Sequence, residues 1–185
     1  MIKRRKIKYL SVLCVICMAS CHNTKTVNHF NTVKQLDINK YEGTWYEIYR
    51  IPVRQEKHLH SVTATYTLNN DNTLTVLNAG YTITNNRKTA TGKAWQPDVN
   101  EPGKLKVQFF WPFSGDYLIL YIDDAYNNVI ISGKDGKYAW ILSRYPTMDE
   151  NISKDMLRLA EEKGLDITKF EKVDQGINIK KQTGH

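Results

Sequence analysis

Gly43-Thr44-Trp45-Tyr46-Glu47-Ile48 opens the first clear strand of the chain, directly after a polar lead-in that ends at Lys40-Tyr41. A second stretch, Tyr138-Ala139-Trp140-Ile141-Leu142-Ser143-Arg144, ends the same run of strands. The glycine lets the chain turn sharply before the large aromatic residue. We expect the Arg144 guanidinium to stack on the Trp45 indole where the first and last strands meet, a cation–π contact worth about 0.5–2 kcal/mol that closes a barrel.

The segment between these two stretches has the pattern of short strands separated by turn-forming residues. Alternation is clearest at residues 61–68, where Val62, Ala64 and Tyr66 share one face and serine and threonine occupy the other. Residues 117–122 are apolar on both faces, which is typical of a strand covered on both sides. Eight strands are predicted, at residues 44–51, 61–68, 73–82, 88–96, 105–111, 117–122, 129–132 and 138–144.

These strands predict an all-β fold, an eight-stranded up-and-down antiparallel β-barrel. Closing the sheet removes both exposed edges and leaves an interior for side chains or for one small ligand. One helix is predicted at residues 149–163, with acidic residues at its start and Gly164 at its end. Its apolar stripe consists of Ile152, Met156, Leu159 and Ala160. We expect the helix to pack outside the barrel, and residues 169–173 to pair with the barrel edge.

The N-terminus has the pattern of a targeting signal. A basic segment from Lys3 to Lys8 precedes an apolar run from Tyr9 to Met18, which is too short to span a bilayer. The run ends in Met18-Ala19-Ser20-Cys21, which resembles a bacterial lipobox and implies cleavage before Cys21 and lipidation of its sulfur and amine. The alternative is an ordinary secretory signal cut near Ala19, which would leave Cys21 as a free thiol.

Cleavage changes what the composition means. Without the 20-residue signal, 165 of the 185 residues remain, enough for one domain with a sizeable core. The signal carries five of the 26 basic residues and no acid, so 21 basic residues face 19 acids and the basic pI gives no support for nucleic-acid binding. We predict a signal peptide at 1–20, a lipidated tether at 21–34, the domain at 35–176 and a polar tail at 177–185.

Inward-facing aromatic residues are the predicted ligand site. An apolar cup with a few hydroxyls suits an acyl chain whose head group stays near water. The alternative for any one of them is simple packing of the core or the helix. The candidates are Tyr49, Tyr66, Trp95, Phe109, Trp111, Tyr117, Tyr121 and Trp140.

Glu47 shares the inward face of the first strand with Trp45. A buried carboxylate is costly unless it is paired. We expect a structural partner for it, namely Arg144, a lysine or a tyrosine hydroxyl. The alternative is a role in recognising or transforming a ligand.

Other polar clusters give weaker signals. His58 and His60 lack the third or fourth ligand that a metal site needs. Asp123 and Asp124 are adjacent, so on a strand they would point to opposite faces, and a turn role is expected. No phosphate-binding glycine loop or nucleophile motif is present, so we expect no catalytic residue, metal or other cofactor.

The order and spacing of several short motifs resemble the bacterial lipocalins from Val33 to Gln175. The resemblance is to the outer-membrane lipoprotein lipocalins, which are similar to apolipoprotein D and the plant temperature-induced lipocalins. Gly43 and Trp45 match the family's first motif and Arg144 its third; the second, a Thr-Asp-Tyr type of turn, is replaced by Ile122-Asp123-Asp124. The other matching pieces are Asn39-Lys40-Tyr41, Val62 to Tyr66, Gly80-Tyr81, Gly92-Lys93-Ala94, Lys106-Val107, Phe109-Phe110 and Tyr145-Pro146-Thr147.

The resemblance implies a lipid-anchored binding protein of the cell envelope. Its implied ligand is a fatty acid or lysophospholipid, its implied membrane contact is the lipidated Cys21 in the outer membrane, and its implied role is envelope lipid upkeep under stress. We expect a monomer or weak homodimer. One alternative is a lipocalin-fold enzyme that acts on a lipid or isoprenoid with Glu47 as acid and base. A second is a structural barrel with a filled core.

Overall fold

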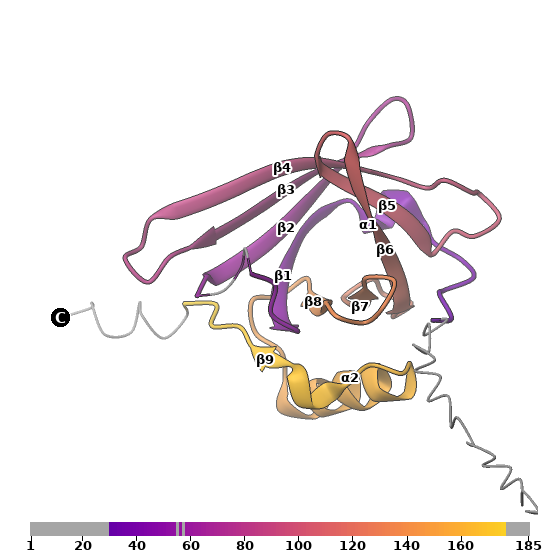
Figure 1. Cartoon of the computed structure of the whole chain (residues 1–185). Coiled ribbons are helices and arrows are strands. Elements are labelled where there is room, and N and C mark those ends of the chain that lie inside the picture. Colours follow the sequence, from indigo (N-terminus) through magenta and orange to yellow (C-terminus); the bar gives the residue numbers. More distant parts are fainter. Residues whose placement is uncertain (1–29, 55, 57, 177–185) are drawn as a thin grey trace, which may run out of the picture.

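The computed structural model describes residues 30–54, 56 and 58–176 and contains a closed antiparallel barrel (Figure 1). The predicted signal peptide, Cys21 and the polar tail lie outside the described residues. The sheet order is β2-β3-β4-β5-β6-β7-β8-β1-β9, and a further pairing of β1 with β2 closes it. The barrel strands are β1 (Gly43–Arg50), β2 (His60–Leu68), β3 (Leu74–Tyr81), β4 (Arg87–Trp95), β5 (Lys104–Phe110), β6 (Phe113–Ile122), β7 (Asn128–Ser132) and β8 (Ala139–Ser143).

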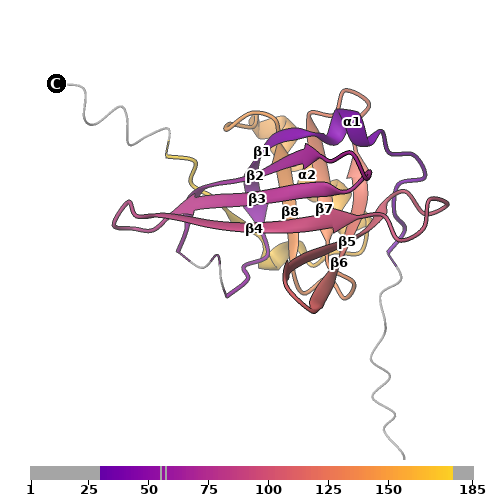
Figure 2. The same cartoon turned by 90° about the horizontal axis from the view of Figure 1, so that it is seen from above.

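All eight predicted strands are confirmed, and the largest difference is at the start of β6. The sequence predicts a break at residues 112–115, yet β6 begins at Phe113 and its first residues pair with β5. Strands β2, β3 and β4 form a layer that crosses over β7 and β8 (Figure 2). The connections β1–β2, β3–β4, β5–β6 and β7–β8 lie at one end of the barrel, which we call the mouth, and the other connections lie at the closed end with α1 (Ile38–Tyr41).

The C-terminal segment fills the place where β1 and β2 separate. Strand β9 (Glu171–Lys172) pairs with Tyr49 and Arg50 of β1, as the sequence predicts for residues 169–173. Beyond it, the Gln175 side-chain amide donates to the backbone oxygens of Glu47 and Val62, at 2.7 and 3.0 Å. The last part of the domain therefore joins the two strands that close the barrel.

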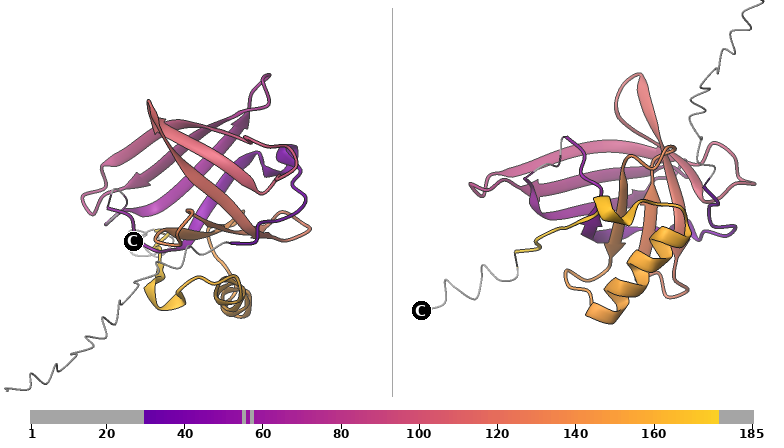
Figure 3. Two further views of the ribbon diagram at one scale, coloured as in Figure 1. Left: turned by 45° about the vertical axis from the view of Figure 1, so that its right-hand side comes forward. Right: turned by 60° about the horizontal axis from the view of Figure 1, so that its bottom comes forward.

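Helix α2 (Glu150–Glu162) covers the outside of the barrel (Figure 3). Asp149 caps it by accepting from the backbone amides of Asn151 and Ile152, and Gly164 ends it with a φ of +91°. Its buried residues include Met156 and Ala160 of the predicted stripe, whereas Ile152 is 43% exposed. A 3-10 turn, η1 (Ile167–Lys169), leads from the helix to β9.

The barrel has two hydrophobic cores, one inside and one between the sheet and α2. The interior core gathers side chains from every barrel strand and includes Trp45, Tyr66, Val76, Leu105, Tyr117, Ile119, Ile131 and Leu142. The outer core includes Phe30, Ile51, Leu120, Ile130, Ile141, Met156, Ala160 and Leu165. Strands β6, β7 and β8 contribute to both, which explains why residues 117–122 are apolar on both faces.

The N-terminal part of the described chain also belongs to the domain. Phe30 packs in the outer core and the Val33 amide donates to the Ile119 oxygen at 2.9 Å. Contacts with the barrel therefore reach back into residues 30–34, the end of the predicted tether. Among the described residues, no helix combines the length and apolar character needed to cross a bilayer.

Candidate functional site

The closed end is fixed by Arg144 and Trp45. The guanidinium lies 3.8 Å from the centre of the indole, which confirms the predicted stack. Arg144 also donates to the backbone oxygens of Thr44 at 3.0 Å and Lys40 at 2.7 Å. Gly43 has a φ of +100°, and a Cβ there would lie 3.2 Å from the Arg144 Nη1, so this position favours glycine for two reasons.

Three tyrosine hydroxyls meet inside the barrel. The Tyr117 hydroxyl lies 2.6 Å from that of Tyr41 and 2.8 Å from that of Tyr66. Burial raises the pKa of Tyr66 to about 12 and the pKa values of the other two phenols well above 10.0, so all three stay neutral at physiological pH. Two hydrogen bonds use two of the three hydroxyl protons, so the third proton can be donated to another group.

Asn78 adds an acceptor to the interior. On β3 it alternates with Leu74 and Val76 of the interior core, so its side chain points inward. Its register neighbours are two small residues, Ala64 of β2 and Ala90 of β4. Its Oδ1 is buried and has no hydrogen-bond partner among the described residues. An unsatisfied buried oxygen costs about 1–3 kcal/mol, a cost that a ligand donor would remove.

A buried charge cluster lies in the mouth half of the barrel. Arg50, 3% exposed, donates to Glu47 at 3.3 Å, to Glu171 at 2.7 Å and to the Leu59 backbone oxygen at 3.3 Å. Burial raises the pKa of Glu47 well above 4.5; the nearby Glu56 carboxylate raises it further, and Arg50 opposes both. The cluster pairs the buried Glu47 carboxyl with the Arg50 guanidinium.

The prediction of a structural partner for Glu47 is confirmed, but the named partners are wrong. Arg144 lies at the closed end, against Trp45, and Arg50 takes its place. Residues three apart on a regular strand point to opposite faces. A β-bulge between Glu47 and Tyr49 changes this alternation, so Arg50 comes to the same side as Glu47.

Four of the eight predicted ligand residues lie in or against the interior core, and four do not. Tyr66 and Tyr117 belong to that core, and Phe109 and Trp140 pack against it. The Trp140 indole donates to Glu56 at 3.1 Å. The inward direction predicted for the other four residues is wrong.

Tyr49 and Tyr121 pack against the outer core, on the side of α2. Each follows an irregularity in its strand, between Glu47 and Tyr49 in β1 and between Ile119 and Tyr121 in β6. A bulge inserts one extra residue and reverses the faces beyond it. The side predicted for Tyr49 and Tyr121 is therefore wrong because each residue follows a bulge.

Trp95 and Trp111 also lie outside the interior. Trp95 follows the buried, inward Ala94 and lines a surface pocket of about 530 Å³ near the β2–β3 turn. Trp111 is 86% exposed, because β5 ends at Phe110 and Trp111 lies in the connection to β6.

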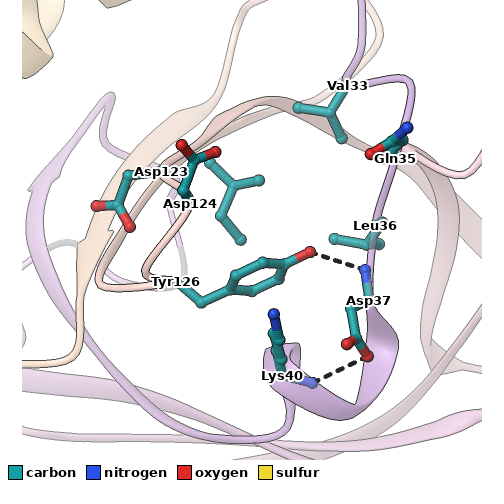
Figure 4. A pocket seen from close by; sticks show the side chains of 9 residues that line it. Val33, Gln35, Leu36, Asp37, Lys40, Asp123, Asp124 and Tyr126 are labelled. Atoms are coloured by element: carbon teal, nitrogen blue, oxygen red, sulfur yellow. Dashed lines mark hydrogen bonds between the residues drawn. The ribbon is translucent and has the colours of Figure 1, made fainter.

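A second surface pocket, of about 500 Å³, lies at the closed end (Figure 4). The Tyr126 hydroxyl accepts from the Asp37 amide at 2.8 Å, and the Lys40 ammonium lies 5.5 Å from the Tyr126 ring centre. Asp123 accepts from the backbone amides of residues 127 and 128, both at 2.8 Å, which confirms its predicted turn role. Among the described residues, no three His, Cys, Asp or Glu side chains are grouped to hold a metal ion.

Comparison with known proteins agrees with this architecture. The family model for a lipocalin-like domain matches residues 36–175. The chain is 37% identical over 159 residues to outer membrane lipoprotein Blc of Escherichia coli (strain K12), covering 85% of this chain and 90% of that protein. It is 40% identical over 152 residues to temperature-induced lipocalin-1 of Arabidopsis thaliana, covering 77% and 81%.

Solved structures show the same fold at lower identity. Insecticyanin from the tobacco hornworm Manduca sexta aligns with a TM-score of 0.65 and 21% identity, covering 78% of this chain and 84% of that one. The names of the bacterial relatives agree with the predicted location in the cell envelope as an outer-membrane lipoprotein. The chain belongs to the lipocalin family.

Proposed function

We propose that this protein binds the acyl chain of a fatty acid or lysophospholipid inside its barrel and stores or carries it for envelope lipid maintenance. The observation that carries the proposal is the buried Asn78 oxygen in the interior, which has no hydrogen-bond partner in the part of the chain that the structure describes. Apolar walls with a few placed polar groups are typical of sites for small hydrophobic ligands. The outer-membrane lipoproteins among its relatives support a ligand from the envelope.

The position of Asn78 favours a ligand with a hydrogen-bond donor in its head group. Asn78 lies three residues before the end of β3 at Tyr81, in the mouth half of the barrel. An acyl chain placed deeper would contact the apolar residues around Tyr66 and Phe109 and leave its head near Asn78 and water. A lysophospholipid has a free glycerol hydroxyl that can donate to Oδ1, whereas an ionised fatty acid has no donor.

A displacement titration tests this proposal. The delipidated protein is loaded with a fluorescent acyl probe and titrated with a lysophospholipid and a fatty acid of equal chain length. We expect the lysophospholipid to displace the probe more strongly, and Asn78→Leu to weaken its binding by about fivefold or more while fatty-acid binding changes little. Thr75→Val, on the same strand, is the matched control. Failure of every lipid to displace the probe would contradict the proposal.

The enzyme alternative rests on Glu47, whose pKa burial raises well above 4.5, a perturbation typical of catalytic acids and bases. To act as a general acid and base, the Glu47 carboxyl would have to contact a bound ligand. It is only 4% exposed and is paired with Arg50. Mass spectrometry of lipids incubated with the protein separates the alternatives. Recovery of unmodified lipid favours binding, and turnover abolished by Glu47→Gln favours the enzyme.

A further inference from the structure

The most exposed aromatic residues of the described chain gather at one hairpin. Phe110, Trp111 and Phe113 are 76%, 86% and 78% exposed, and they flank Pro112 in the β5–β6 connection. We call these three residues the aromatic tip. Large apolar side chains exposed together on a soluble domain mark a surface that contacts another apolar phase.

The hairpin stands clear of the rest of the barrel. Strand β4 pairs with β5 only through residues 93–95, so the end of β5 near the tip has no neighbour on that side. A register shift between Val107 and Phe110 separates the tip from the regular sheet, and a Cβ added at Gly115 would meet nothing within 4 Å. The projecting hairpin is visible in Figure 2. The tip can therefore enter a surface without rearrangement of the barrel.

The other mouth connections carry positive charge. The β3–β4 connection presents a further apolar side chain, Ile83, which is 82% exposed. Among the described residues of the mouth connections, the one exposed carboxylate is Asp135, and Lys137 pairs with it at 2.6 Å. The exposed cations of these connections and of the start of β4 are Arg54, Arg87, Lys88, Lys134 and Lys137.

The described chain begins close to one of the mouth connections. Phe30 lies close to the β7–β8 connection of the mouth, because a Cβ at Gly136 would come within 2.9 Å of its ring. Phe30 lies nine positions after the predicted lipidation site Cys21, a span of at most about 32 Å when fully extended.

We propose that the mouth of the barrel docks on an anionic phospholipid bilayer, with the aromatic tip inserted at the boundary between head groups and acyl chains. Tryptophan and phenylalanine favour this depth, and the lysine and arginine side chains of the other mouth connections would interact with lipid phosphates. A second copy of the chain is a poorer occupant. A symmetric dimer through this face would bring the same cations together. The inference does not depend on which ligand the barrel holds.

Vesicle flotation of the unlipidated chain from His22 to His185, which contains every contact described above, tests this docking. Vesicles of phosphatidylcholine alone are compared with vesicles that also contain phosphatidylglycerol. We expect binding that increases with phosphatidylglycerol and falls about tenfold or more in the Phe110→Ser/Trp111→Ser variant. Val99→Ser is the matched control, because Val99 is 80% exposed in the β4–β5 connection at the closed end.

Two further measurements make the outcome specific. Brominated lipids should quench the fluorescence of the wild-type protein more than that of Trp111→Phe, and acyl-probe binding should be equal in the wild type and the tip variant. Wild-type chain that does not float, or a tip variant that floats as well as Val99→Ser, would overturn the proposal. Light scattering that shows a dimer lost only in the tip variant, with flotation unchanged, would assign this surface to a second copy.

Discussion

Arg144 stacks on Trp45 at 3.8 Å and donates to backbone oxygens of the segment that leads into β1. A residue that directly follows the last barrel strand therefore binds the start of the first one. The Trp45 indole in turn donates to the Tyr41 backbone oxygen at 2.9 Å. The contact joins the N-terminal helical turn, β1 and the end of β8. It lies at the opposite end of the barrel from the mouth, where we expect the ligand to enter.

Replacing Arg144 tests that separation. We expect Arg144→Ala to lower the free energy of unfolding by about 1–3 kcal/mol, because the cation–π contact and several hydrogen bonds are lost. The affinity for the acyl probe should stay within about twofold of the wild-type value. This is well below the tenfold change that a loss of about 1.4 kcal/mol in binding free energy would cause. Denaturant melts and probe titrations measure both quantities. A variant with wild-type stability and no ligand binding would show that the guanidinium recognises the ligand.

The buried Glu47 carboxyl predicts a pH dependence of stability. Its folded pKa is raised above 4.5 by burial, so the folded state keeps a proton that the unfolded state has already lost. Its contribution is complete below the unfolded pKa and is lost as pH rises through the folded pKa. Glu47→Gln should therefore flatten the fall in the free energy of unfolding from pH 4.5 upward. Equal slopes in wild type and variant would refute this assignment.

The tyrosine cluster makes a prediction at alkaline pH. The unfolded phenols ionise near 10.0, whereas burial raises the pKa of folded Tyr66 to about 12. Stability should therefore be lost as pH rises between these values, and absorbance titration should show tyrosines that ionise only when the protein unfolds. Tyr117→Phe removes both hydroxyl contacts and should cost about 1–2 kcal/mol. Tyr145→Phe, exposed beyond β8, serves as its control, and an equal loss in both variants would argue against the cluster.

The predicted lipid anchor can be tested in cells. Cys21→Ser removes the residue that the Met18-Ala19-Ser20-Cys21 motif marks for lipidation. We expect less protein in detergent-extracted outer-membrane fractions and no incorporation of labelled palmitate. Incorporation of palmitate into the Cys21→Ser protein would contradict the anchor site.

The barrel, its closure contact and its outer helix could be predicted from the sequence because they depend on local patterns. Alternating strands, the Gly43 and Trp45 spacing, and the Asp149 cap each act over a few residues. The faces of Tyr49 and Tyr121 could not be predicted, since a bulge reverses alternation without a sequence signal of its own. Arg50 was missed for the same reason.

Tyr41 and Asn78 were missed for a different reason. Tyr41 lies in a short helical turn before the first strand, and its hydroxyl reaches Tyr117 only because the chain folds across the closed end. Asn78 is an ordinary strand residue in the sequence, and its unpartnered oxygen emerges only once its neighbours are placed. Both depend on contacts between residues far apart in the chain.

A crystal structure of the protein with a bound lysophospholipid tests the central claim most directly. We expect an acyl chain inside the barrel against Phe109 and Trp140, with a head-group hydroxyl within hydrogen-bond distance of the Asn78 Oδ1. Lipid bound only outside the barrel, with the interior packed as in the protein alone, would contradict it.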